Sequence, residues 1–102
     1  MKPKPGTRYR SQVGDTEIVI VRAPAAEVEL TCGGKPVIGF DETRADGAAP
    51  VPGLDEATPV GKRYVDDAGT LEVLVTKAGT GTLALGDVPL TLKSAKPLPS
   101  SD

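Results

Sequence analysis

The feature that most constrains this 102-residue chain is a repeat at a fixed offset of 55 positions. Gly-Thr-Arg-Tyr at positions 6–9 recurs as Gly-Lys-Arg-Tyr at positions 61–64. Seven of the 25 positions in residues 6–30 are identical in residues 61–85. Self-similarity at a constant offset indicates one supersecondary unit that is present twice. We therefore expect two tandem units of the same shape.

Each unit has the pattern of short β-strands joined by tight turns. The apolar, β-branched run at 17–22 and its counterpart at 71–76 predict buried strands. Returning strands are expected at 27–30 and 81–85, where apolar residues recur after a turn. The remaining expected elements are turns at 23–26, 33–34, 77–80 and 86–87 and third strands at 36–40 and 88–92. No segment keeps helical spacing of apolar residues, so the predicted fold class is all-β.

Composition divides the chain into four parts. We expect the first repeat at 1–40, a linker rich in Pro, Ala and acidic residues at 41–60, the second repeat at 61–92, and an extended tail at 93–102. Twelve Gly and ten Pro favour turns over long helices. Because aromatic residues make up 3% of the chain, the core must come from Val, Leu and Ile.

The residue inventory excludes several classes of function. Without histidine the chain has no Ser-His or Cys-His nucleophile pair, and its one cysteine cannot form an internal disulfide or a Cys-rich metal site. We therefore expect no catalytic residues, no metal, no cofactor and no enzymatic activity. The net charge of −2, with both signs scattered, argues against a nucleic-acid partner. No apolar run spans a membrane and no secretory signal is visible, so a cytoplasmic location is expected.

Two short motifs resemble a known family. Tyr-Arg-Ser-Gln-Val-Gly-Asp at 9–15, a predicted hairpin, and Cys-Gly-Gly-Lys-Pro-Val at 32–37 resemble desulforedoxin and the N-terminal domain of desulfoferrodoxin, small proteins of rubredoxin type. That family has Tyr-x-Cys-x-x-Cys-Gly and, after the hairpin, Cys-Cys-Gly-x-Pro-Met. The second repeat falls on the same frame at 64–70 and 85–90. The resemblance implies two desulforedoxin-like hairpin units, packed as a pseudo-two-fold symmetric dimer within one chain.

The same resemblance implies that the metal site has been lost. The family's four sulfur ligands hold one iron, and one thiol remains here at eight equivalent positions. Those positions are Ser11, Gly14, Cys32 and Gly33 in the first repeat and Asp66, Gly69, Leu85 and Gly86 in the second. Electron transfer through a tetrahedral thiolate site therefore does not carry over. Fusing the repeats would let the two strand sets share one core, which would replace the folding energy that a metal supplies.

A few residues remain as candidates for binding. The recurring pairs Arg8-Tyr9 and Arg63-Tyr64 form either a ligand patch presented twice or packing elements with solvated arginines. Cys32 is either a buried small hydrophobe, a reactive thiol, or one ligand of a metal shared between chains. Phe40, beside the linker, is either a partner anchor or a core residue.

These observations favour a non-catalytic accessory or protein-interaction protein with a protein partner, as a monomer or a homo-oligomer. Its exposed strand edges, linker or Pro-rich tail would make the contact. One alternative is a protein that binds a small molecule or an ion in the groove between the repeats. Another is a redox or metal protein that acts through Cys32 in an oligomer.

Overall fold

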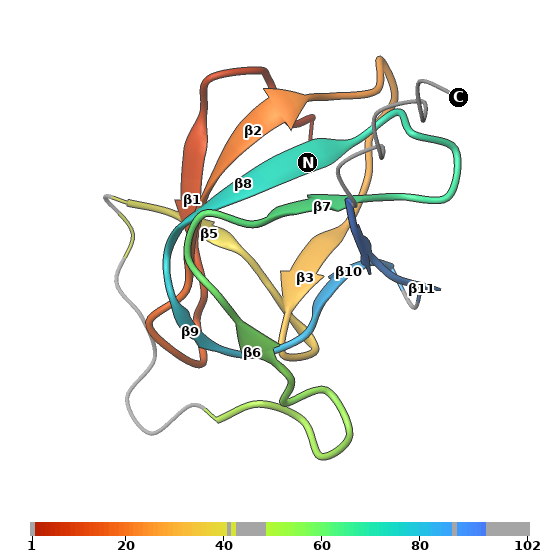
Figure 1. The fold of residues 1–102 in the computed structure, drawn as a ribbon. Helices are drawn as coiled ribbons and strands as arrows, with labels where there is room; N and C mark the ends of the chain where they lie inside the picture. The colour runs from red at the N-terminus through yellow and green to blue at the C-terminus, as the bar shows by residue number, and fades with distance from the viewer. Residues whose placement is uncertain (1, 41, 43–48, 87, 94–102) are drawn as a thin grey trace, which may run out of the picture.

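The computed structural model describes residues 2–40, 42, 49–86 and 88–93, and these are all-β, without helix (Figure 1). The two longest strands are β2 (Glu17–Arg22) and β8 (Glu72–Lys77). Both are runs of β-branched and aliphatic residues, which suit a pleated surface that is buried on one side. They pair antiparallel at the centre of the larger sheet, with Val19 opposite Leu74.

The larger sheet has six antiparallel strands in the order β12-β7-β8-β2-β1-β5. The strands that flank the central pair are β1 (Arg8–Arg10), β5 (Ile38–Gly39), β7 (Arg63–Val65) and β12 (Thr91–Leu92). β1 and β7 begin just after Gly6 and Gly61, whose φ angles of 85° and 82° are readily adopted by glycine alone. The recurring Gly-x-Arg-Tyr segments therefore form a positive-φ turn followed by a short strand.

A second sheet has four strands in the order β11-β10-β3-β4, and a third has two, β6 and β9. Their bounds are β3 (Leu30–Cys32), β4 (Lys35–Pro36), β10 (Leu83–Leu85), β11 (Val88–Pro89), β6 (Ala57–Thr58) and β9 (Gly79–Thr80). At the centre of the four-stranded sheet Thr31 lies opposite Ala84. The chain passes from this sheet to the six-stranded one at two buried residues, Val37 and Leu90.

One core holds the two larger sheets together. Alternate residues of the central strands are buried, and they meet aliphatic residues from β3 and β10. The buried core cluster consists of Ile18, Ile20, Leu30, Cys32, Val37, Leu71, Val73, Val75, Leu83 and Leu90. Tyr9 and Tyr64 pack against it and are partly buried. Burial of each aliphatic side chain contributes about 1.5–3 kcal/mol to the free energy of folding. The buried cluster consists of aliphatic side chains and the Cys32 thiol, so its stabilisation comes mainly from Ile, Leu and Val.

The predicted all-β class is confirmed, and both apolar runs expected as buried strands form strands, the second at 72–77 instead of 71–76. The strand expected at 27–30 instead begins at Leu30, and the turn expected at 77–80 contains strand β9. The two third strands are each interrupted, by Val37 and by Leu90, because the chain changes sheet there. The tight turn predicted at 33–34 is present, with φ angles of 67° at Gly33 and 86° at Gly34.

Within the segment expected as a linker, residues 49–60 are described and include β6, whose Thr58 is buried. Most of the tail expected at 93–102 lies outside the described residues. No helix among the described residues is long and apolar enough to cross a membrane.

Candidate functional site

In the first repeat, Ser11 and Cys32 stand at two of the positions that the resemblance equates with metal ligands. Both side chains lie in a buried cluster of hydroxyl groups and one thiol. Ser11, Thr16, Cys32 and Thr58 are each 2% exposed or less. The Thr58 hydroxyl donates to the carbonyl of Gly79 at 3.0 Å and lies 2.5 Å from the Thr16 hydroxyl. Since a hydroxyl has one proton, Thr16 is the donor in the second bond.

The other two polar groups of the cluster, the Cys32 thiol and the Ser11 hydroxyl, also have hydrogen-bond partners within the protein. The Cys32 thiol donates to the Gly81 carbonyl at 3.5 Å, and the Ser11 hydroxyl accepts from the Val13 amide at 3.0 Å. Burial raises the pKa of the Cys32 thiol, although hydrogen bonds with the Ser11 and Thr16 side chains oppose the shift. A thiol that stays protonated is a poor nucleophile and a poor metal ligand. The cluster therefore stabilises the interior and has no activated group.

The segment between the repeats covers this cluster. A Cβ atom on Gly33 would lie 2.5 Å from Val13 Cγ2 and 3.2 Å from Pro50 Cβ, and one on Gly34 would lie 2.6 Å from Val51 Cγ2. The Val51 amide also donates to the Gly33 carbonyl at 2.9 Å. A cysteine at Gly33, one of the ligand-equivalent positions, therefore has no room in this structure.

In the second repeat, two of the four corresponding positions, Asp66 and Leu85, border an open hollow of about 240 Å³. Asp66, Asp67, Ala68, Leu85 and Val88 line it. Asp66 accepts from the Leu71 amide at 3.0 Å and from the Thr70 hydroxyl at 2.7 Å. Burial on its own would raise the pKa of Asp66, but these hydrogen bonds outweigh it and lower the pKa. This carboxylate organises the turn at 66–71.

No group of three or more His, Cys, Asp or Glu side chains converges on a point within the described residues. The first-repeat cluster offers one protonated thiol, and the second-repeat hollow offers carboxylates from two adjacent residues, Asp66 and Asp67. The donor set of either place does not match a tetrahedral thiolate site.

The recurring Arg-Tyr pairs do not form one patch of rings and guanidinium groups. Tyr9 lies opposite Ile18 and Tyr64 opposite Val73, so both rings face the core. Arg8 and Arg63 are exposed on the other side of the six-stranded sheet. Burial, together with the charge of Glu56, raises the pKa of Tyr64. The tyrosines are therefore packing elements, which was one of the two roles considered from the sequence.

The two other candidates have opposite environments. Cys32 is fully buried, so its thiol cannot reach a neighbouring molecule while the fold is intact. Phe40 is 42% exposed and follows β5, the outermost strand of the six-stranded sheet. Of the candidates on the first repeat, Phe40 and Arg8 are the ones that a partner can reach.

Sequence reasoning missed a buried carboxylate with two basic partners. Glu72 is 4% exposed; its side chain accepts from Lys93 Nζ at 2.8 Å and from Arg63 Nη1 at 3.3 Å. The hydrogen bond from Lys93 lowers the pKa of Glu72; burial opposes this, and the charges of Lys93, Arg63 and Arg22 add to the lowering. The sequence did carry a signal for this residue, because a glutamate recurs at the same place in both apolar runs, as Glu17 and as Glu72.

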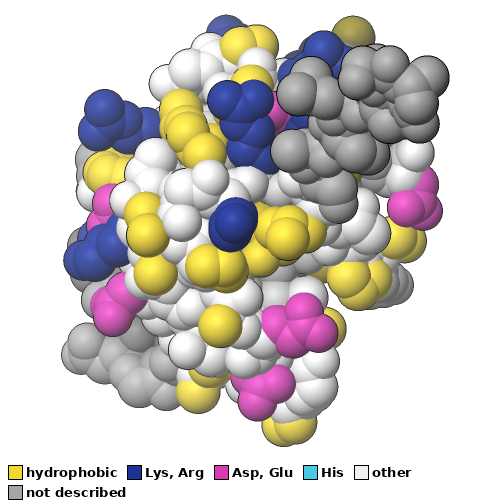
Figure 2. Space-filling model, viewed as in Figure 1, with side chains coloured by type: hydrophobic (Ala, Val, Ile, Leu, Met, Phe, Trp, Pro, Cys, Tyr) yellow, Lys and Arg dark blue, Asp and Glu magenta, His cyan; other side chains and the backbone are white. Residues whose placement is uncertain are grey.

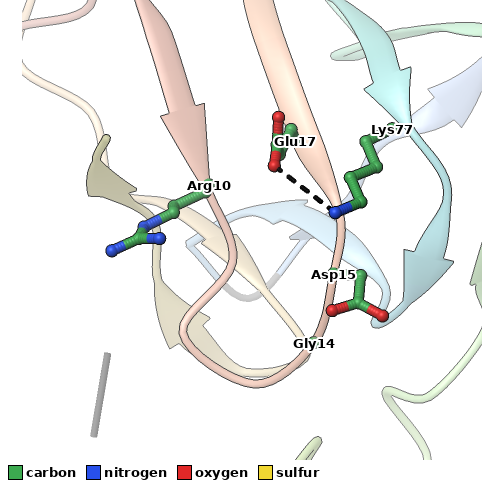
Figure 3. A pocket seen from close by; sticks show the side chains of 5 residues that line it. All are labelled: Arg10, Gly14, Asp15, Glu17 and Lys77. Atoms are coloured by element: carbon green, nitrogen blue, oxygen red, sulfur yellow. Dashed lines mark ion pairs between the residues drawn. The ribbon is translucent and has the colours of Figure 1, made fainter. Parts of the chain in front are cut away.

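A small pocket lies at the end of the first hairpin (Figure 3). It encloses about 100 Å³ and is lined by Arg10, Gly14, Asp15, Glu17 and Lys77. Lys77 Nζ lies 3.9 Å from Glu17 Oε2, while Arg10 points away from this pair (Figure 3). Ligand pockets usually enclose about 300–1,000 Å³, so this one is too small for most organic ligands.

A larger hollow, of about 270 Å³, lies over the centre of the four-stranded sheet. It is lined by Glu29, Thr31, Gly34, Val51, Leu54, Ala84 and Gly86, which come from both repeats and from the segment between them. It corresponds to the groove between repeats that was considered from the sequence.

Comparison with known proteins adds no relative to this description. No family model matches the chain, and neither a curated protein nor a solved structure matches it.

Proposed function

We propose that this protein is a non-catalytic interaction protein, built on two tandem desulforedoxin-like hairpin units that pack as a pseudo-two-fold dimer and hold no metal. The pairings support the repeat. β1 pairs with β2, Tyr9 opposite Ile18, and β7 pairs with β8, Tyr64 opposite Val73, each residue 55 positions later. The pairing of β3 with β4, in which Thr31 lies opposite Pro36, recurs between β10 and β11, in which Ala84 lies opposite Pro89; each residue is 53 positions later.

The contacts between the units support the two-fold arrangement. At a two-fold axis a residue faces its own counterpart. Val19 faces Leu74, 55 positions later, and Thr31 faces Ala84, 53 positions later. Two amide hydrogen bonds between the units are also reciprocal, from Gly33 to Thr82 at 2.9 Å and from Gly86 to Glu29 at 2.7 Å.

The observation that carries the non-catalytic assignment is the closed state of the first-repeat cluster. Its hydroxyls and its thiol bond one another or nearby backbone, and all four side chains are buried. A catalytic nucleophile needs an adjacent base and access to substrate, and neither is available there. The place that resembles a metal site serves the interior of the fold.

The outer strands of the six-stranded sheet support a role in protein binding. These outer strands are β5 and β12. Phe40 follows β5 and is 42% exposed, and Leu92 lies in β12 and is 48% exposed. The β12 edge supports this role most directly, because on the β5 edge Glu42 already bonds the Gly39 amide at 2.6 Å and the Gly39 carbonyl at 3.1 Å. The outer strands of the four-stranded sheet contain Pro36 and Pro89, and proline limits pairing with a further strand. The six-stranded sheet is therefore the better template for a partner.

The hollow over the four-stranded sheet favours a second candidate function, binding of a small molecule between the repeats. Its lining includes the carboxylate of Glu29 and the hydroxyl of Thr31 beside the aliphatic Val51 and Leu54. Its volume of about 270 Å³ falls just below the usual range for organic ligands. A ligand-dependent rise in melting temperature would favour this candidate over the interaction protein.

Quantitative affinity capture from the source cell tests the proposal. The wild-type chain should retain a reproducible protein partner, and Phe40→Ser should reduce its recovery by about tenfold, because interface anchors carry much of the binding energy. Val60→Ser is the matched control, since Val60 is 59% exposed and lies outside the strands. Stoichiometric iron or zinc in the purified protein would contradict the metal-free assignment, and absence of any partner would contradict the interaction role.

A further inference from the structure

One row of side chains crosses the outer face of the six-stranded sheet. The register places Arg8 opposite Val19, Val19 opposite Leu74, and Leu74 opposite Arg63, across β1, β2, β8 and β7. Residues on either side of this row along the strands face the core, so the row faces outward. Two arginines therefore flank two aliphatic side chains on one surface, which we call the arginine-flanked face.

This face is basic although the chain is acidic overall. The charged residues that it presents, including Asp15 at its border, are Arg8, Arg10, Arg22, Arg63, Lys77, Lys93, Asp15, Glu17 and Glu72. Six basic groups thus lie with three acidic ones, in a chain with a net charge of −2. In Figure 2 hydrophobic side chains gather across the middle of the molecule, and basic ones lie mainly in its upper and left parts.

Two of the three acidic groups form ion pairs within this face. Glu72 is bound by Lys93 and Arg63, and Glu17 lies 3.9 Å from Lys77. Arg8 forms no ion pair within the described part of the chain, and the Arg22 side chain contacts a backbone carbonyl, that of Gly69, at 3.4 Å. Positive potential therefore remains over the face for an anionic partner.

The centre of the face is aliphatic. Val19 and Leu74 are half-buried, and Val21 is 40% exposed. Both tyrosine rings face the core, and the third aromatic residue, Phe40, is an exposed ring at the edge of the sheet beside β1, so this surface has no row of rings on which successive nucleic-acid bases could stack. A partner with aliphatic side chains between its acidic groups fits this surface better than a nucleic acid does.

We propose that the arginine-flanked face binds an acidic segment of a partner protein, with an aliphatic side chain over Val19 and Leu74 and carboxylates at Arg8 and Arg63. Three strand spacings place the backbones of the two arginines about 14 Å apart. In an extended peptide, residues i and i+4 are separated by about the same distance and point to the same side as residue i+2. The fitting pattern is acidic-x-aliphatic-x-acidic. The inference rests on the proposed interaction function and names the partner's chemistry.

The test uses the synthetic peptide Ser-Glu-Thr-Leu-Thr-Glu-Ser, capped at both ends and titrated into the ¹⁵N-labelled protein. We expect chemical-shift changes concentrated in the amides of β1, β2, β7 and β8, and binding that weakens as salt is added. A peptide with Lys in place of both Glu residues should bind at least about tenfold more weakly. Shifts scattered over both sheets, or equal binding of the Lys peptide, would overturn the proposal.

Variants then locate the site. Arg8→Glu should weaken peptide binding by about tenfold at low salt. Because Arg8 is exposed and has no ion pair in the described residues, this change leaves the Glu72 contacts intact. Lys35→Glu, an equal charge change on the edge of the four-stranded sheet, is the matched control and should retain binding. Val19→Ser tests the aliphatic centre. An equal loss from Lys35→Glu, or tighter binding of a single-stranded oligonucleotide to the same amides, would overturn the assignment.

Affinity capture separates this inference from the proposed function. If Arg8→Glu keeps the cellular partner while Phe40→Ser loses it, the arginine-flanked face is wrong and the interaction function stands. If the wild-type chain retains no partner, the interaction function itself fails.

Discussion

The two segments that recur in the sequence pair their strands in corresponding registers, but they fill corresponding places in opposite ways. In the first, Thr16 and Cys32 bury a hydroxyl and a thiol in the interior. In the second, the counterparts at offsets of 55 and 53 are Leu71, which is fully buried, and Leu85, which is partly buried. The first place is covered by residues of the segment between the repeats, and the second is a hollow of about 240 Å³.

The difference shows why the first repeat needs a side chain from the segment between the repeats. A buried hydroxyl without a hydrogen bond is destabilising, so Thr16 requires an acceptor. Thr58 supplies it, because β6 pairs with β9 and brings this side chain into the interior. Leu71 needs no such partner. The segment also bonds the second repeat, because β6 pairs with β9 and the Gly81 and Thr82 amides donate to the carbonyls of Glu56 and Leu54, both at 2.8 Å. Its backbone therefore joins both repeats, whereas its Thr58 hydroxyl serves the polar interior of the first.

The largest expected effect compares the turn glycines Gly33 and Gly86. Both have positive φ, 67° and 61°, but a Cβ atom on Gly33 would collide with Val13, and one on Gly86 would meet nothing within 4 Å. We expect Gly33→Ala to destabilise the fold by about 3 kcal/mol and Gly86→Ala by about 1 kcal/mol. Urea unfolding measures both. Equal losses would show that packing around the two turns does not differ.

The next effect concerns Glu72 and its counterpart Glu17. Because the pKa of Glu72 is lowered in the folded state, the unfolded state binds more protons, and stability falls as pH falls through that lowered pKa. The contribution is complete above the ordinary value of about 4.5. Glu72→Gln should lose about 2 kcal/mol at pH 7 and flatten the acid limb of the stability curve. Glu17→Gln is the control, since that side chain is 30% exposed and its effect should stay below about 0.5 kcal/mol.

A smaller effect tests the buried hydroxyl pair. Thr58→Val keeps the volume but leaves Thr16 without its acceptor, so a loss of about 1–2 kcal/mol is expected. Adding Thr16→Val should recover part of that loss, which a double-mutant cycle by thermal or urea unfolding would reveal. Thr91→Val, at an exposed hydroxyl, should change stability by less than about 0.5 kcal/mol. Strict additivity of the two core substitutions would disprove the coupling.

The smallest expected effect comes from filling the hollow of the second repeat, which would make its packing more like that of the first. Val13 is 8% exposed, whereas its counterpart Ala68 lies on the rim of the open hollow. Ala68→Val should raise stability by about 0.5 kcal/mol by burying two further methyl groups against Leu85 and Val88. Ala78→Val, at an exposed position beside β9, is the control. A melting temperature that falls for Ala68→Val would mean that the hollow cannot accept these groups.

Much of the fold could be predicted because local patterns carry it. The runs at Glu17–Arg22 and Glu72–Lys77 are apolar and β-branched, and both form the expected buried strands. The short strands were harder. β6 and β9 lie in segments with Gly, Pro and Thr and without a two-residue period, so only their mutual pairing makes them strands. Residues 27–30 do alternate polar with apolar, but only Leu30 of these belongs to β3.

The candidate site was predicted in part. The positions of Ser11 and Cys32 came from the motifs, but Thr16 and Thr58, which complete the cluster, have no local signal. The recurring Arg-Tyr pairs could be found in the sequence. Which member of each pair faces the core could not, because that depends on which side of the sheet is buried.

The all-β class, the recurrence of residues at a fixed offset and the lack of a thiolate or histidine set could be read from the amino-acid sequence, because composition, periodicity and spacing are properties of the chain alone. The tertiary structure decided which residues meet. Thr16 bonds Thr58 across 42 positions, and Arg8 aligns with Arg63 through Val19 and Leu74, because strand register and sheet packing set distances that no local pattern encodes.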